Sequence, residues 1–145
     1  MKRLLSLLAL LAAPLVAFAL VTGLALEGRE VVVLHTSDAD GSERSTRAWI
    51  AEDGAGRLWL EANNDQSPWL LDVMTNGSIR VERAGKESSW RALPDPSPPA
   101  QARVRSLMAA KYGWADAWVG RFFGSPHSVA VRLVPSRPLS EPAPR

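Results

Sequence analysis

The feature that most constrains this chain is an uncharged apolar run that begins at its fourth residue. No charged side chain occurs from Leu4 to Leu26, and Lys2 and Arg3 stand just before this run. As a helix the run would reach roughly 34 Å, enough to cross a hydrocarbon core of about 30 Å. Basic flanks tend to stay in the cytoplasm. We therefore expect residues 1–26 to form a single-pass anchor in the cell membrane, with the rest on the extracytoplasmic side, which is the periplasm in a Gram-negative cell.

A cleaved signal peptide is the alternative interpretation of the same residues. Ala17-Phe18-Ala19 has the small-x-small pattern of a cleavage site. The apolar run continues to Leu26, however, so cleavage there would leave an apolar new N-terminus. The apolar part of a signal peptide is also usually shorter, about 7–15 residues. Length favours the uncleaved anchor, and both interpretations export the remaining chain.

The exported part of the chain carries no net charge. Removing Lys2 and Arg3 from the 17 basic residues leaves 15, which equals the 15 acidic residues. The basic patch that nucleic-acid binding requires is therefore not expected. The chain contains no cysteine and two histidines, which excludes disulfides and thiolate chemistry and leaves little material for a metal centre.

Short β-branched or alternating segments separated by polar turns indicate an antiparallel sheet. We expect strands at residues 30–36, 44–51, 57–62, 79–82, 88–93 and 128–134. A helix should begin at Ser67-Pro68 and end at Asn76-Gly77, and further helices should cover 98–112 and 114–122. This order predicts an α+β domain, a six-stranded antiparallel barrel or strongly curved sheet with helices at its sides, over residues 27–134. The proline-rich residues 135–145 are expected to be a disordered tail.

The segment from Val31 to Val134 resembles the split-barrel flavin and deazaflavin oxidoreductases, which include nitroreductase and quinone reductase family proteins with a pyridoxamine-phosphate-oxidase-like fold. Three strings carry this resemblance: VVVLHT followed by Arg44-Ser-Thr46-Arg47, LWLEANN leading into Ser67-Pro68-Trp69, and Lys111-Tyr112-Gly113-Trp114.

The resemblance implies a six-stranded split β-barrel that often pairs as a homodimer and binds a flavin-like cofactor in a groove on its outside. On this basis the chain would be a membrane-anchored oxidoreductase that reduces quinones or similar planar acceptors with a cofactor of the flavin mononucleotide type. Members that use deazaflavin have a Gly-Arg-Lys-Ser-Gly turn after the first strand. Here residues 37–41 read Ser-Asp-Ala-Asp-Gly, and these acids would repel a phosphate, so deazaflavin is not expected in the usual mode.

The cofactor-binding residues that the resemblance implies are Arg44, Thr46, Asn63, Asn64, Ser67 and Trp69. Arg44 and Thr46 share one face of a strand and are suited to an anionic group, although an ordinary salt partner is the simpler explanation for Arg44. Asn63, Asn64 and Ser67 precede a helix N-terminus, where free backbone N–H groups attract anions. Capping of that helix is the simpler explanation for Ser67.

Tyr112 and Trp114 are candidates for lining a pocket for a planar small molecule, and core packing accounts for them equally well. Trp118 and Phe122 are expected to pack on the side of the barrel. No catalytic residue can be identified, because the sequence shows no nucleophile motif and no spaced acid pair. Two functions therefore stay open: the oxidoreductase, and a non-catalytic module that binds a ligand or partner and has lost the cofactor.

Overall fold

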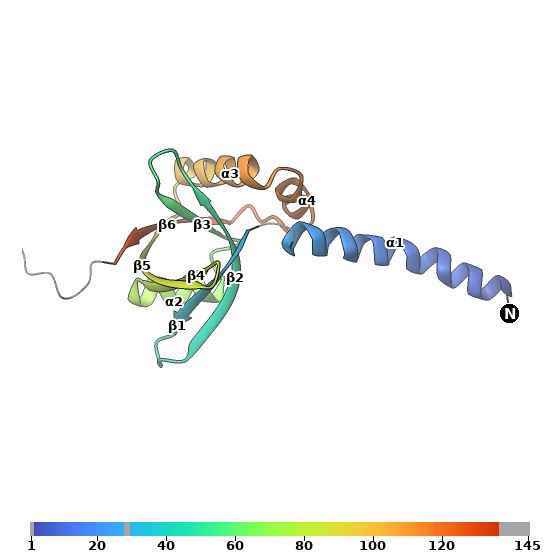
Figure 1. Cartoon of the computed structure of the whole chain (residues 1–145), viewed down its shortest axis with the longest axis horizontal. Helices are drawn as coiled ribbons and strands as arrows, with labels where there is room; N and C mark the ends of the chain where they lie inside the picture. Colours follow the sequence, from blue (N-terminus) through green and yellow to red (C-terminus); the bar gives the residue numbers. More distant parts are fainter. Residues whose placement is uncertain (1, 28–29, 137–145) are drawn as a thin grey trace, which may run out of the picture.

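The chain folds into a closed barrel of six antiparallel strands with helices outside it (Figure 1). The computed structural model describes residues 2–27 and 30–136, and the side chains of 12–25 and 30–136. The strands are β1 (Val31–Ser37), β2 (Glu43–Glu52), β3 (Leu58–Ala62), β4 (Ser78–Arg83), β5 (Lys86–Asp95) and β6 (Val129–Pro135). The helices are α1 (Lys2–Glu27), α2 (Pro68–Asn76), α3 (Pro98–Tyr112) and α4 (Trp114–Phe123).

The order of strands around the barrel is β1-β2-β3-β6-β5-β4, and β4 pairs with β1 to close it. Val33, for example, lies opposite Arg47 of β2 on one side and Glu82 of β4 on the other. The predicted α+β class and the predicted antiparallel sheet with flanking helices are confirmed. Of the two forms expected, barrel or curved sheet, the chain adopts the barrel.

The barrel interior is filled by the apolar side chains that alternate along each strand. Leu58, Leu60 and Ala62, which alternate along β3, are all buried in this core. Helix α2 contributes to the same core, since Trp69, Leu70 and Val73 pack with the inward-facing strand residues. The rest of this cluster is Val32, Leu34, Ile50, Ile79, Val81, Ala92, Val129, Val131 and Leu133.

A second core lies outside the barrel, under α3. Val104, Met108 and Tyr112 project from α3 onto the outward-facing side chains of the sheet. Ala51 of β2 and Ala130 of β6 are among these partners, and their small side chains allow the helix to approach closely. The elements that carry the candidate site are thus fixed between two apolar layers.

The C-terminal part of helix α1 packs against α4, and the rest of the helix extends away from the domain (Figure 1). The ring of Phe18 lies 5.6 Å from that of Trp118 and 5.2 Å from that of Phe122. The expectation that Trp118 and Phe122 pack on the barrel side is therefore wrong, because α1 offers them an aromatic partner.

Two sequence predictions concern the ends of the chain. Among the residues described at side-chain level, no helix has the length and apolar character needed to cross a membrane. Strand β6 includes Pro135, and the rest of the predicted tail, from 137 onward, lies outside the described residues.

Candidate functional site

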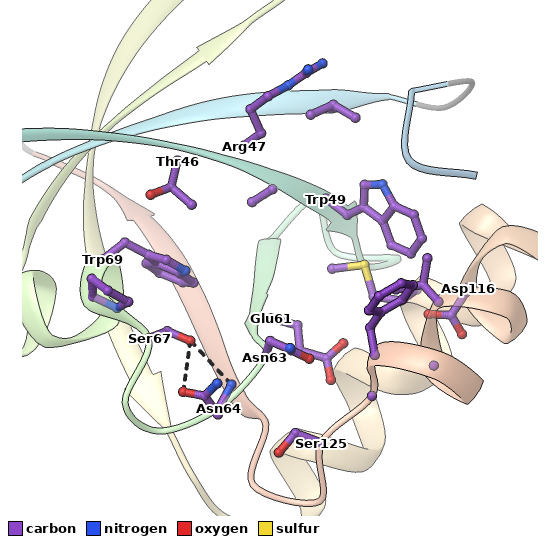
Figure 2. A pocket seen from close by; sticks show the side chains of 18 of the residues that line it. Thr46, Arg47, Trp49, Glu61, Asn63, Asn64, Ser67, Trp69, Asp116 and Ser125 are labelled. Carbon is purple, nitrogen blue, oxygen red and sulfur yellow. Dashed lines mark hydrogen bonds between the residues drawn. The ribbon is translucent and has the colours of Figure 1, made fainter. Parts of the chain in front are cut away.

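A groove opens where strands β2 and β3 separate. Residues 43–49 of β2 pair with β1, but β2 pairs with β3 only from Ile50 to Glu52. The first half of β2 therefore has no β3 partner, and a hollow of about 1050 Å³ lies beside it (Figure 2). Cofactor sites in proteins commonly have volumes of about 300–1,000 Å³.

Apart from Val31 of β1, four parts of the chain that are distant in sequence form the walls of this groove. They are residues 44–49 of β2, residues between 61 and 69 from the end of β3 into α2, Arg105 and Met108 of α3, and residues between 116 and 126 from α4 and the loop after it. Figure 2 shows Trp49 and Trp69 on opposite sides of the hollow. The groove thus has aromatic surfaces at its sides and polar groups between them.

All six residues predicted to bind a cofactor line this one groove. They are Arg44, Thr46, Asn63, Asn64, Ser67 and Trp69. The two residues predicted to line a pocket, Tyr112 and Trp114, lie elsewhere. Tyr112 is buried in the layer under α3, and Trp114 is half exposed at the start of α4. The structure brings the six together without showing what they bind, so cofactor binding stays a prediction.

Arg44 has the salt partner that the simpler interpretation expected. Its Nε lies 3.2 Å from Oδ2 of Asp72, a buried carboxylate on α2. Thr36 donates to the same oxygen at 2.6 Å. Asp72 engages only Nε of Arg44, and the Arg44 side chain lines the groove and is 43% exposed. Arg44 therefore has a structural contact and an exposed cationic end at once.

Ser67 stands at the N-cap position of α2 but does not cap the helix with its side chain. Its Oγ instead accepts a hydrogen bond from the backbone N–H of Asn64 at 3.3 Å. The expectation that capping explains Ser67 fully is wrong, because the hydroxyl is turned into the loop that borders the groove. Asn64 accepts the backbone N–H of Gln66 at 2.9 Å, which fixes the same loop.

A partly buried ion-pair network in the groove was not predicted from the sequence. Arg105 donates to Glu61 at 2.8 Å and to Asp116 at 3.0 Å. Burial opposes the charge of Arg105, but these two carboxylates outweigh it and raise the pKa of the guanidinium. Glu61 is 44 residues from Arg105 in the sequence, so no local pattern could have paired them. Both acids are therefore engaged by one guanidinium.

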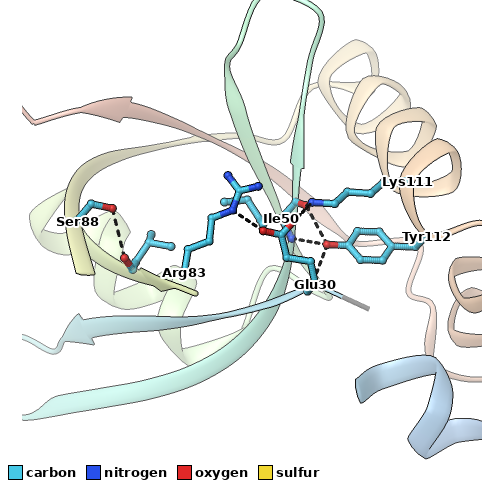
Figure 3. A network of polar contacts seen from close by, with 7 residues as sticks. Glu30, Ile50, Arg83, Ser88, Lys111 and Tyr112 are labelled. Atoms are coloured by element: carbon cyan, nitrogen blue, oxygen red, sulfur yellow. Dashed lines mark hydrogen bonds and ion pairs between the residues drawn. The ribbon is translucent and has the colours of Figure 1, made fainter. Parts of the chain in front are cut away.

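Tyr112 performs a structural role behind the groove (Figure 3). Its hydroxyl accepts the backbone N–H of Ile50 at 3.0 Å and donates toward the backbone carbonyl of Glu30 at 2.9 Å. Burial raises the pKa of Tyr112 to about 12, so it stays protonated at neutral pH. Its ring stacks on Trp49, which itself lines the groove.

The acidic turn after β1 does not belong to the groove. Residues 37–41 are absent from its lining. Asp38 instead organises the turn, since its Oδ1 accepts the backbone N–H groups of Asp40 and Ser42, each at 2.9 Å. Elsewhere in the described residues, no group of three or more histidine and carboxylate side chains is placed to hold a metal ion.

Comparison with known proteins gives a result at the level of the fold. No family model matches the sequence, and none of the curated proteins is detectably similar to it. Among solved structures, a conserved hypothetical protein from Mycobacterium tuberculosis matches with 20% identity and a TM-score of 0.57, over 82% of this chain and 80% of that one.

Two further structures are similar. The haem storage protein HutZ from Vibrio cholerae matches with 14% identity and a TM-score of 0.59, over 79% of this chain and 87% of its own. An F420-H2-dependent reductase matches with 15% identity and a TM-score of 0.50, over 70% of this chain and 92% of its own. At these identities the likeness shows the fold alone. The structural neighbours are split-barrel proteins, and the chain has their fold.

Proposed function

We propose that this chain is a membrane-anchored split-barrel protein that holds a planar, flavin-type cofactor in the groove between β2 and α4 and serves as a reductase of quinones or similar planar acceptors. The observation that carries the proposal is the convergence of all six implied cofactor residues on one groove. They come from β2, from the loop after β3 and from the start of α2, so their proximity is a product of the fold.

The donor set of the groove fits a flavin mononucleotide. Such a cofactor has a flat, largely apolar ring system at one end and a phosphate at the other. Trp49 and Trp69 offer ring faces for the flat part. Arg44 offers its exposed guanidinium end for the phosphate, and amides of Asn63 and Asn64 offer hydrogen bonds between them.

The protein's part in this proposal is to bind and orient. A bound flavin would supply the transfer of electrons or hydride itself. Thr46 and Arg44 would fix the anionic end, while Trp69, which is only 5% exposed, is held rigidly enough by the barrel core to set the position of the ring. Arg105 would hold Glu61 and Asp116 in place, which keeps the adjacent wall polar.

The second candidate function is a module that binds a planar ligand without catalysing a reaction. One observation favours it: both groove carboxylates, Glu61 and Asp116, are engaged by Arg105. The described lining therefore offers no carboxylate without a cation partner to act as a general acid or base. The neighbour HutZ, described as a haem storage protein, is an example of this fold in such a role.

The membrane location is proposed from the sequence of α1. The uncharged run from Leu4 to Leu26 is long enough to span a membrane, and Lys2 and Arg3 before it favour a cytoplasmic start. Exposed apolar side chains along the described part of α1 agree with this, since Leu15 is 72% and Leu20 is 64% exposed. The intact mass of the purified protein tests it, because a cleaved signal would remove about two kilodaltons, roughly the mass of the residues up to a site after Ala19.

The experiment that tests the function uses the full chain in detergent. Absorbance and mass spectra would be recorded before and after adding flavin mononucleotide, a deazaflavin or haem. Near-stoichiometric uptake of flavin, followed by reduction of a soluble quinone with a chemical donor, supports the reductase. Uptake of flavin or haem without quinone reduction supports the binding module. If none of the three is taken up, the groove does not hold such a cofactor and the proposal fails. Light scattering of the same sample would give the oligomeric state and test the predicted homodimer.

A further inference from the structure

Helix α4 turns one face to the groove and has a second face on its opposite side. Asp116, Val119, Gly120 and Phe123 line the groove. At about 100° per residue, these positions gather on one side of the helix. The opposite side is formed by a second set, which is Trp114, Trp118 and Phe122 with Ala117 and Arg121 beside them.

The second face is unusually apolar for a surface helix. Trp114 is 51% exposed and Phe122 is 48% exposed, so two large rings stand in solvent on a helix of ten residues. Contiguous exposed apolar groups of this kind mark a surface that something covers. Arg121 lies on the same face, is exposed, and makes no ion pair within the described part of the chain.

The neighbour of this face within the chain is helix α1. Trp118 donates from Nε1 to the hydroxyl of Thr22 at 3.2 Å, and its ring lies 5.6 Å from Phe18. Phe122 meets Phe18 edge to face at 5.2 Å. The contact covers one edge of the aromatic face and leaves Trp114 open.

The position of these contacts along α1 determines how deep α4 would lie in a membrane that α1 spans. Thr22 and Phe18 precede Leu26, the end of the apolar run, by four and eight residues, which is roughly 6 and 12 Å at about 1.5 Å per residue. If α1 spans the membrane, the side of α4 that contacts it therefore lies just inside the headgroups, at the depth of the outer part of the acyl chains. Tryptophan is enriched at this level, and interfacial helices bury their apolar face about 5–10 Å deep there.

We propose that α4 is an interfacial helix whose face of Trp114, Ala117, Trp118, Arg121 and Phe122 is covered by the outer leaflet of the membrane from which α1 emerges. The apolar rings enter the boundary between headgroups and acyl chains, and Arg121 binds lipid phosphate. This proposal rests on the anchoring part of the proposed function. Because the opposite face of α4 forms a wall of the groove, it also places the groove beside the bilayer, within reach of a lipid-dissolved planar ligand.

The absence of cysteine from the chain makes a direct test possible, since any introduced cysteine is unique. Four single-cysteine variants would carry a nitroxide spin label in lipid nanodiscs of phosphatidylcholine and phosphatidylglycerol. Ala117→Cys and Arg121→Cys report on α4, Leu15→Cys reports on the anchor, and Asp40→Cys reports on the turn at the far end of β1. All four positions are exposed, so the labels should not disturb the core.

The measurement is how strongly molecular oxygen, which enters lipid, and a water-soluble nickel chelate each relax the label. The proposal expects the ratio of relaxation by oxygen to relaxation by the chelate to be several-fold higher at 117 and 121 than at 40. The ratio at 117 and 121 should still be lower than the ratio at 15. If 117 and 121 match 40 while 15 is in lipid, the anchor stands and the interfacial helix is overturned. If 15 also matches 40, the anchoring fails and takes this proposal with it. Dipolar broadening at 117 that disappears on dilution with unlabelled protein would assign the face to a second copy and also overturn it.

Discussion

Trp49 stacks on Tyr112 with the ring centroids 4.4 Å apart and the planes inclined by 10°. One ring borders the groove and the other lies in the buried layer under α3, so this pair joins the site to the helix that supports it. The hydroxyl of Tyr112 extends the connection to the backbone of Ile50 in β2. The wall of the groove is thereby held by a helix whose own residues are mostly outside it.

Replacing Tyr112 by Phe tests whether Tyr112 stabilises the wall of the groove or binds the ligand directly. The change keeps the ring stacked on Trp49 but leaves the buried N–H of Ile50 without its acceptor. We expect the free energy of unfolding to fall by about 1–3 kcal/mol, with the affinity for flavin unchanged. Chemical denaturation and a flavin titration measure the two quantities. A large loss of flavin affinity in a folded variant would instead place Tyr112 in the binding site.

Replacing Arg44 by Ala should weaken an anionic cofactor. The loss of one charged hydrogen bond corresponds to about 1.5–3 kcal/mol, or roughly a 10- to 150-fold increase in Kd for flavin mononucleotide. Arg80→Ala is the matched control, because Arg80 is also a half-exposed strand arginine with carboxylate partners but lies outside the groove. Titration by fluorescence quenching gives both constants. Equal affinities in the two variants would remove Arg44 from the site.

The ion pairs of Glu30 should make the stability of the fold depend on pH in the acidic range (Figure 3). The hydrogen bond from Arg83 lowers the pKa of Glu30 below its ordinary 4.5, burial opposes this, and Lys111 adds to the lowering. A lowered pKa in the folded state stabilises the fold above the ordinary value, and this contribution is lost as the pH falls through the folded value.

The variant Glu30→Gln tests the sign of this effect. The difference in Tm between the original chain and the variant should be largest above pH 4.5 and should shrink as the pH falls below it. Glu43→Gln is the control, since Glu43 forms an exposed pair with Arg80 that is worth little. A difference that grows in acid would contradict the assignment.

The junction between α3 and α4 depends on glycine at position 113. Gly113 has φ 56° and ψ −122°, a backbone conformation that side chains with a Cβ strongly disfavour. Gly113→Ala should therefore destabilise the fold by about 1–3 kcal/mol. Gly54→Ala is the control, because Gly54 has open space around it and no positive φ, and should change stability little. Thermal unfolding compares them; equal Tm values would show that the junction tolerates the strain.

The strands, the helices and part of the groove lining could be predicted from the sequence. Alternation in β3 and the turn residues around α2 are local signals, so the strands and helices could be predicted from them. Arg44 and Thr46 could be placed on one face because the side-chain period of a strand is fixed. The structure then puts that face beside Asn63, Asn64 and Ser67.

The parts of the site that could not be predicted depend on which layer of the molecule a side chain enters. Local sequence patterns carry no information about that layer. Tyr112 and Trp114 are two residues apart, yet one is buried and the other half exposed, because the chain turns sharply at Gly113 between them. The contact of Arg105 with Glu61 likewise requires the tertiary fold to bring α3 beside β3. At Ser67 the residue type predicts a side-chain cap of the helix, but its hydroxyl accepts a hydrogen bond from the backbone N–H of Asn64 instead.

The position of the last strand has a consequence for how the protein is made. β6 lies between β3 and β5 and completes both of those seams. It also supplies Val129, Val131 and Leu133 to the barrel core. Until these residues have been synthesised, two strands keep unpaired edges and the interior stays incomplete. The barrel can therefore close only after β6 has been synthesised, so the five strands made before it cannot form a complete core by themselves.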